Sequence, residues 1–273
     1  MTERPVLPWT HLLTESQQGV VVLVVPTVLV VPRVRRAAVP SLQGKVTLWV
    51  CSPPTSAETS KHSTLADYVD ETIQHLWPDG LESPCHVVGH SMGGFGAIAL
   101  HDRLAEHSCP VALTLLETPC PAVVLDDVLR DHLLLPPNHP GLAALEELTE
   151  RRMSSFLDPV SQQQMLTRLE RWHQDLIDDA DPALLARTPG ICRSDVYLRW
   201  AEWAMLVLTG VDVRIGTATY MLDAEGDADR TAREWSPFAD DLRMVRSSVS
   251  HDKLIESRDL VDHLSRWAAA VTS

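Results

Sequence analysis

A continuous run of apolar, mostly β-branched residues at positions 19–25 most narrowly limits the fold of this chain. After one glycine, the run consists of valines and a leucine, without a polar side chain. Such a strand is typical of a parallel sheet with helices on both faces, because neither of its faces can meet water. The wider apolar stretch, residues 20–31, is too short for a membrane helix, which needs about 20 residues. We therefore expect a buried central strand here and no membrane span.

Strand and helix patterns alternate along the rest of the chain. This β-α-β order predicts a doubly wound, mostly parallel sheet with right-handed crossovers. Further strands are expected at residues 45–50, 85–88, 111–116, 213–222 and 242–249, and amphipathic helices at residues 64–77, 93–106 and 259–270.

The middle of the chain has a different pattern, dominated by helical spacing. We expect one domain with an α/β core at about 19–120 and 211–273, interrupted by a helical insertion at about 121–210. An insertion above the carboxyl ends of parallel strands is well placed to serve as a lid. The best helix candidates within it are residues 142–156, 162–177 and 195–207.

Composition excludes several classes of protein. Hydrophobic residues make up 45% and charged residues 22%, which excludes general disorder. The net charge of −14 argues against a nucleic-acid surface. The N-terminus lacks a basic start followed by an apolar stretch, and the five cysteines form no C-x-x-C pair. We therefore expect a cytoplasmic protein with reduced thiols, and no metal or cofactor, because no His/Cys cluster has zinc spacing.

The strongest chemical signal is the segment Gly89-His90-Ser91-Met92-Gly93-Gly94. It follows an apolar strand and opens an alanine-rich helix, which is the context of the G-x-S-x-G nucleophile elbow. The serine of an elbow lies on a sharp, strained turn, and small residues around it let neighbouring backbone approach. We therefore expect Ser91 to be a nucleophile.

A serine nucleophile needs a general base. His251 follows the last expected strand and precedes the closing helix, where this architecture places its base. His90 is expected to pack beside the site, and His263 is expected on the surface of the closing helix.

A carboxylate must orient the histidine and stabilise its charged form. One candidate is Glu117, at the end of the strand that follows the nucleophile helix. The other candidates follow the next strand, and the residues alone leave both places open. They are Asp223, Glu225, Asp227 and Asp229.

On these residues the chain resembles the α/β-hydrolase superfamily, and within it the thioesterases of polyketide and non-ribosomal peptide biosynthesis. The resemblance rests on the elbow, the segment Leu115-Leu116-Glu117-Thr118-Pro119, the helical insertion and the late His251. In these thioesterases the matching strand ends in leucine-aspartate, and the aspartate is the triad acid. The resemblance therefore implies Glu117 as the acid in preference to Asp229, with a glutamate in place of the usual aspartate.

The same resemblance implies an oxyanion hole of two backbone N–H groups. One belongs to Met92, directly after the nucleophile, and the other to Thr27 or Val28, after the early strand. The family usually has a glycine in that early turn, and this chain has none there. The resemblance raises the question of whether that loop is preformed or ordered by substrate.

The function implied is release of an acyl, polyketide or peptidyl chain from a carrier-protein phosphopantetheine thioester, by hydrolysis or cyclisation. The alternatives are a carboxylesterase or lipase acting on oxygen esters, and a degenerate hydrolase fold that only binds. We expect a free-standing protein whose partner is an acyl or peptidyl carrier protein. Apolar residues of the last insertion helix are candidates for an acyl pocket or for helix packing. They are Tyr197, Trp200, Trp203 and Met205.

Overall fold

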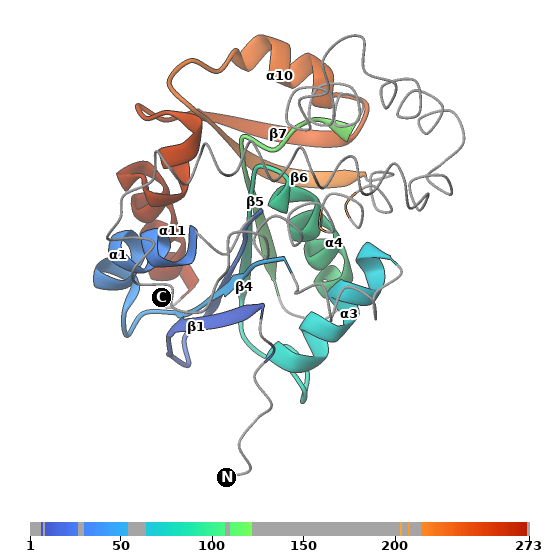
Figure 1. Ribbon diagram of the computed structural model, residues 1–273. Helices are drawn as coiled ribbons and strands as arrows, with labels where there is room; N and C mark the ends of the chain where they lie inside the picture. The colour runs from blue at the N-terminus through green and yellow to red at the C-terminus, as the bar shows by residue number, and fades with distance from the viewer. Residues whose placement is uncertain are drawn as a thin grey trace, which may run out of the picture.

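The described part of the chain is built on one mixed sheet (Figure 1). The computed structural model describes residues 7, 9–26, 30–53, 64–106, 110–121, 203, 207 and 214–271. Within them, seven strands have the order β1-β3-β2-β4-β5-β6-β7, and all neighbours are parallel except the edge pair β1 and β3. The strands are β1 (Thr10–Thr14), β2 (Val20–Val24), β3 (Thr47–Cys51), β4 (Cys85–His90), β5 (Val111–Leu116), β6 (Ile215–Leu222) and β7 (Ala239–Arg246). The predicted doubly wound α/β class is confirmed.

The central strands are buried on both faces, as their composition predicts. Every residue of β2 and of β4 is buried. Between these two strands the strand order reverses, because β3 lies on one side of β2 and β4 on the other. Ligands of open α/β sheets bind at the carboxyl ends of the strands beside such a reversal. The ends of β2 and β4 therefore mark the edge where a site is expected.

Helices cover both faces of the sheet. Helices α1 (Val31–Leu42) and α11 (Arg258–Val271) lie against one face, and α3 (Leu65–Leu76) and α4 (Gly93–Ala105) against the other (Figure 1). Two apolar clusters result, one on each side of the sheet. Helix α4, which begins just after the serine of the elbow, is thereby fixed between the sheet and α3.

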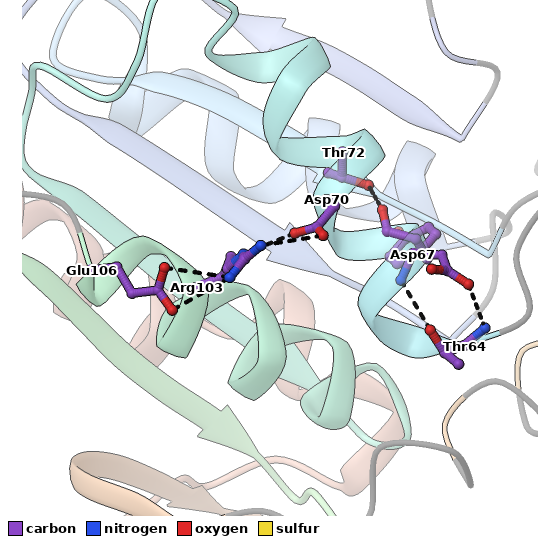
Figure 2. A network of polar contacts seen from close by, with 7 residues as sticks. Thr64, Asp67, Asp70, Thr72, Arg103 and Glu106 are labelled. Carbon is purple, nitrogen blue, oxygen red and sulfur yellow. Dashed lines mark hydrogen bonds and ion pairs between the residues drawn. The ribbon is translucent and has the colours of Figure 1, made fainter.

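A polar network joins α3 to α4 at the surface (Figure 2). The Thr64 hydroxyl accepts a hydrogen bond from the Asp67 N–H, and the Asp67 carboxylate accepts one from the Thr64 N–H. These two bonds form a capping box at the start of α3. Arg103 of α4 donates to Asp70 at 2.9 Å. Exposed ion pairs of this kind contribute at most about 1 kcal/mol, so apolar packing dominates this contact.

Two elements differ from the expectation at the start of the chain. The apolar stretch 20–31 is not one strand, because β2 ends at Val24 and α1 begins at Val31 with a proline in its first turn. Proline fits the first helical turn because it has no N–H to lose there. Ahead of β2, β1 adds an antiparallel edge strand that the sequence analysis did not expect.

Two further differences lie near the end of the chain. The expected strand 242–249 is displaced, because β7 spans Ala239–Arg246 and pairs Ala239 with Ile215. An unexpected short helix, α10 (Ala228–Trp235), fills the connection between β6 and β7. The expected strand 213–222 and closing helix 259–270 agree closely with β6 and α11.

Most of the expected helical insertion lies outside the described residues. Of its three expected helices, only Trp203 and Val207 of the last one are described. Both of these residues are helical and fully buried. The Trp203 ring contacts the Tyr68 ring edge-on, with centroids 5.0 Å apart, and belongs to the core on the α4 side. Tyr197, Trp200 and Met205 lie outside the described residues. In the part of the chain that is described, no helix is long and apolar enough to cross a membrane.

Two buried histidines lie on β4, one near each end of the strand. His86 is 2% exposed and His90 is 5% exposed. The His86 Nε2 atom lies 2.8 Å from the Thr114 hydroxyl, which also lies 3.1 Å from Nε2 of His263. The expectation that His263 is a surface residue is therefore wrong, because its ring turns toward the sheet and contacts His86.

These histidines predict a loss of stability in mild acid. Burial lowers the pKa of His86 and of His90 to about 3, against about 6.5 in an unfolded chain. The unfolded state therefore binds protons first as the pH falls below about 6.5, and the free energy of unfolding decreases from there toward pH 3. Between pH 7 and 5 each histidine removes about 2 kcal/mol. Urea unfolding at several pH values measures this decrease, and His86→Gln should reduce it by roughly 2 kcal/mol; an unchanged decrease would contradict the prediction.

Candidate active site

Ser91 occupies a strained turn between β4 and α4. Its φ angle is 51°, in the left-handed backbone region that residues other than glycine rarely adopt. Two backbone hydrogen bonds hold this turn: the Ser91 N–H donates to the Leu116 carbonyl at 2.9 Å, and the Gly94 N–H donates to the Ser91 carbonyl at 2.9 Å. The local geometry is that of the predicted nucleophile elbow.

The glycines of the elbow make room for close backbone contacts. A Cβ atom on Gly93 would lie 2.4 Å from the carbonyl oxygen of Val24, at the end of β2. A Cβ atom on Gly94 would lie 2.0 Å from the Thr118 hydroxyl oxygen. The start of α4 is therefore pressed against the end of β2 and against the Thr118 side chain after β5, so a larger residue would displace the Val24 backbone or that side chain.

Glu117 follows β5 and adopts the same unusual backbone conformation, with φ at 45°. Among the described residues, Ser91 and Glu117 are the two non-glycine residues with positive φ. The Glu117 N–H donates to the Met221 carbonyl of β6 at 3.0 Å, which continues the pairing of β5 with β6 by one more residue. Strain of this kind persists where the surrounding structure enforces it, and it concentrates at functional sites.

The Glu117 carboxylate lies between two neighbouring segments. Its Oε1 atom accepts a hydrogen bond from the Asp223 N–H at 3.1 Å. Its Oε2 atom lies 3.8 Å from Nδ1 of His251, an ion-pair distance longer than a hydrogen bond. Catalytic contacts are often longer in unliganded structures and tighten with substrate. The structure thus brings the two residues together.

His251 begins the short 3₁₀ helix η3 (His251–Glu256) after β7. Its backbone N–H donates to Oδ2 of Asp223 at 3.1 Å. The side chain is 42% exposed, so the imidazole is accessible to a reactant. Asp223 therefore contacts the backbone of His251, whereas Glu117 faces its ring.

The remaining candidate acids have other roles in the structure. Asp227 caps α10 and accepts hydrogen bonds from the backbone N–H groups of Asp229 and Arg230, each at 3.0 Å. These bonds lower the pKa of Asp227, and the bond from the Arg230 N–H has the largest effect. Asp229 and Glu225 are exposed. Among the described residues, none of these three forms a hydrogen bond or ion pair with His251.

A cleft of about 530 Å³ opens beside these side chains. Its walls come from the elbow, the end of β5, β6, the connection after β6, α10 and η3, which lie far apart in the sequence. The lining residues are Ser91, Glu117, Thr118, Pro119, Cys120, Tyr220, Asp223, Glu225, Gly226, Asp227, Arg230, Thr231, Glu234, Trp235 and His251. The described residues contain no group of three or more His, Cys, Asp or Glu side chains that could hold a metal ion.

A family model for the alpha/beta hydrolase family matches residues 8–270, nearly the whole chain. The chain belongs to the alpha/beta hydrolase family. No curated protein matches this hydrolase.

Solved structures with the same fold include biosynthetic thioesterases. YbtT, a type II thioesterase from the yersiniabactin NRPS/PKS pathway, is 11% identical over 97% of this chain and 100% of its own, with a TM-score of 0.56. BorB, a type II thioesterase from the borrelidin cluster, is 12% identical over 97% and 98%, with a TM-score of 0.55. The NocB thioesterase domain, bound covalently to a fluorophosphonate nocardicin G analogue, is 15% identical over 97% and 100%, with a TM-score of 0.51. At these identities the likeness shows the fold.

Only part of the expected oxyanion hole of this hydrolase lies in the described residues. Met92 is buried at the start of α4, where backbone N–H groups are free of helical partners and the helix dipole favours negative charge. Thr27 and the alternative Val28 lie outside the described residues. The chain that leads to them leaves β2 at Val24, directly against Gly93.

Helix α10 supplies a part of the cleft wall that is not expected from the sequence. Arg230, Thr231, Glu234 and Trp235 all line the cleft. The sequence does contain a signal for this helix. Asp227 is a typical N-cap residue, and the positions that line the cleft follow it at the spacing of three and four residues that is typical of one helix face. The sequence alone places the acids of this segment on a loop after the expected strand, as candidates for the triad acid, so no helix is expected there.

Gly226 offers a test that separates activity from stability. A Cβ atom at this position would lie 2.9 Å from Oε1 of Glu117 and 2.9 Å from Cδ2 of Leu222. The ends of these side chains can move, so we expect Gly226→Ala to cost no more than about 1–2 kcal/mol of stability. The displaced carboxylate should nevertheless lower kcat by roughly tenfold or more, since small misplacements at an active site are costly.

The matched control is Gly216→Ala on β6, where an added Cβ would meet no atom within 4 Å. Ester hydrolysis and thermal unfolding are measured for both variants. A Gly226→Ala protein with unchanged kcat would show that the position of the Glu117 carboxylate does not affect the reaction.

Proposed function

We propose that this hydrolase is a serine thioesterase that releases an acyl, polyketide or peptidyl chain from a carrier-protein phosphopantetheine thioester. The observation that carries the proposal is the pair of strained residues, Ser91 and Glu117, which face one cleft together with His251. The thioester class is supported by the likeness in fold to YbtT, BorB and NocB. The proposed partner is an acyl or peptidyl carrier protein.

In this mechanism the Ser91 hydroxyl attacks the thioester carbonyl carbon while His251 takes its proton. The Met92 N–H and a second backbone N–H, that of Thr27, stabilise the negative charge that forms on the carbonyl oxygen. The carbon–sulfur bond then breaks, and His251 gives its proton to the leaving thiolate. The products of this half-reaction are a free thiol and an acyl ester on Ser91.

The second half-reaction frees the acyl chain. Water, or a hydroxyl or amine within the acyl chain, attacks the ester carbonyl while His251 takes a proton. The bond to the Ser91 oxygen breaks, and the proton passes to that oxygen. Glu117 faces Nδ1 of His251, which leaves Nε2 for both proton transfers, and its negative charge stabilises the imidazolium.

The experiment compares the purified protein on acyl-N-acetylcysteamine thioesters, carrier-bound acyl thioesters and matched oxygen esters. We expect higher kcat/KM for thioesters, and higher still for the carrier-bound form. A clear preference for oxygen esters without carrier-protein binding would instead support a carboxylesterase. Absence of labelling by a fluorophosphonate would contradict any serine mechanism and favour a fold that only binds.

A further inference from the structure

The backbone of His251 is held by a side chain at each of its two polar atoms. Its N–H donates to Oδ2 of Asp223 at 3.1 Å, from the connection after β6. Its carbonyl oxygen lies 3.2 Å from Nε2 of His90, the last residue of β4. The start of η3 is thus fixed from two different strands of the sheet.

The contact with the His251 carbonyl defines which nitrogen of the His90 ring carries a proton. A carbonyl oxygen can only accept, so Nε2 of His90 must carry the proton that is donated. Burial, followed by repulsion from His251, lowers the pKa of His90 to about 3, so the ring is neutral and Nδ1 is without a proton. Nδ1 is buried and has no hydrogen-bond partner among the described residues. The buried His90 imidazole therefore has one acceptor nitrogen, Nδ1, without a hydrogen bond in the described part of the chain.

The His90 ring also lies against the ring of His251. The two centroids are 5.1 Å apart and the planes are inclined by 31°. Other charged groups near the pair come from α1 and η3: Arg33 disfavours a charge on His90 and Asp252 favours it. Arg33 also donates to the Asp252 carbonyl and, at 2.7 Å, to Glu256, so α1 is bonded to the same 3₁₀ helix.

His90 and Ser91 are consecutive residues. The hydrogen bond from His90 therefore links the residue next to the proposed nucleophile with the backbone of the proposed base. A shift of either segment would be transmitted to the other, and a displacement near 1 Å at an active site can reduce the rate by about 100-fold.

We propose that His90 is a positioning residue that fixes His251 relative to Ser91 through its Nε2–H hydrogen bond to the His251 carbonyl. This inference rests on the proposed serine mechanism. His90 takes no proton from the reactant; it sets where the base lies.

Two substitutions separate the hydrogen bond from the ring. His90→Phe keeps an aromatic ring and removes the donor. His90→Gln removes the ring but keeps an N–H at the same number of bonds from the backbone. The matched control is His86→Phe, a substitution of the other buried histidine on β4, which is bonded to Thr114 instead. All are assayed in the full chain.

The measurement is kcat and KM on butyryl-N-acetylcysteamine, expressed per active site titrated with a fluorophosphonate, so that unfolded protein is not counted. We expect His90→Phe to lower kcat roughly 10- to 100-fold with KM nearly unchanged. His90→Gln should recover most of that loss, and His86→Phe should keep the wild-type kcat per titrated site.

Each outcome decides a different point. If His90→Phe retains the wild-type kcat per site, or if His90→Gln is as impaired as His90→Phe, the hydrogen bond does not position the base and the inference is wrong. An equal loss in His86→Phe would indicate a general packing effect and would also overturn it. If the wild type itself is neither labelled nor active, the proposed serine mechanism fails instead.

Discussion

Replacing Ser91 with alanine is expected to lower kcat by about 10⁴-fold or more, because the proposed acyl-enzyme forms on the Ser91 oxygen. Alanine should accept the backbone turn no worse than serine, since both have a Cβ atom and the turn requires a φ angle near the 51° of Ser91. The free energy of unfolding should therefore stay close to that of the wild type. Steady-state thioester hydrolysis and fluorophosphonate labelling measure the effect directly.

Ser248→Ala is a suitable control for this variant. Ser248 is exposed and precedes His251 by three residues, outside the cleft lining. It should keep wild-type activity and labelling. If Ser91→Ala were labelled as strongly as the wild type, the nucleophile would lie elsewhere in the chain.

Replacing Glu117 with glutamine is expected to lower kcat by about 10³- to 10⁴-fold. Glutamine keeps the size of the side chain but loses the charge that, in the proposed mechanism, stabilises the His251 imidazolium. It also allows the imidazole to turn or to adopt the wrong tautomer. Because Oε2 is already 3.8 Å from Nδ1, the shorter Glu117→Asp should be impaired as well, despite keeping the charge.

The competing candidate for the acid is tested by Asp229→Asn. Asp229 is exposed in the first turn of α10, and its substitution should change kcat by less than about threefold, as for a solvated charge. A larger loss in Asp229→Asn than in Glu117→Gln would reverse the assignment. Asp223→Asn retains an oxygen acceptor for the His251 N–H, so it should be affected less than Glu117→Gln.

The elbow could be predicted because its physical requirements are local. A strand, a strained serine and closely packed small residues occur within one short segment, so Ser91 could be placed from the sequence alone. The order of strands and helices placed His251 near the same edge of the sheet. The residues alone could not choose between Glu117 and the later acids, because that choice depends on how β5 and β6 lie side by side.

The missed elements have weaker local signals. Helix α1 contains β-branched residues and an internal proline, which oppose helix formation, although its buried residues follow helical spacing. Helix α10 buries only Trp235, whose ring packs against that of Tyr220 on β6, so few apolar positions mark it as a helix in the sequence. Strand β7 lies at an edge with partly exposed residues throughout, and its register is set by pairing with β6.

Strands β5 and β6 are neighbours in the sheet although residues 117–214 separate them in the chain. The chain entropy lost in closing such a connection grows only with the logarithm of its length, by about 0.6 kcal/mol for each doubling. A connection of about 100 residues therefore costs only about 1.2 kcal/mol more than one of about 25 residues. The sheet can thus tolerate large changes in the length of the chain between Glu117 and β6 without a large loss of stability.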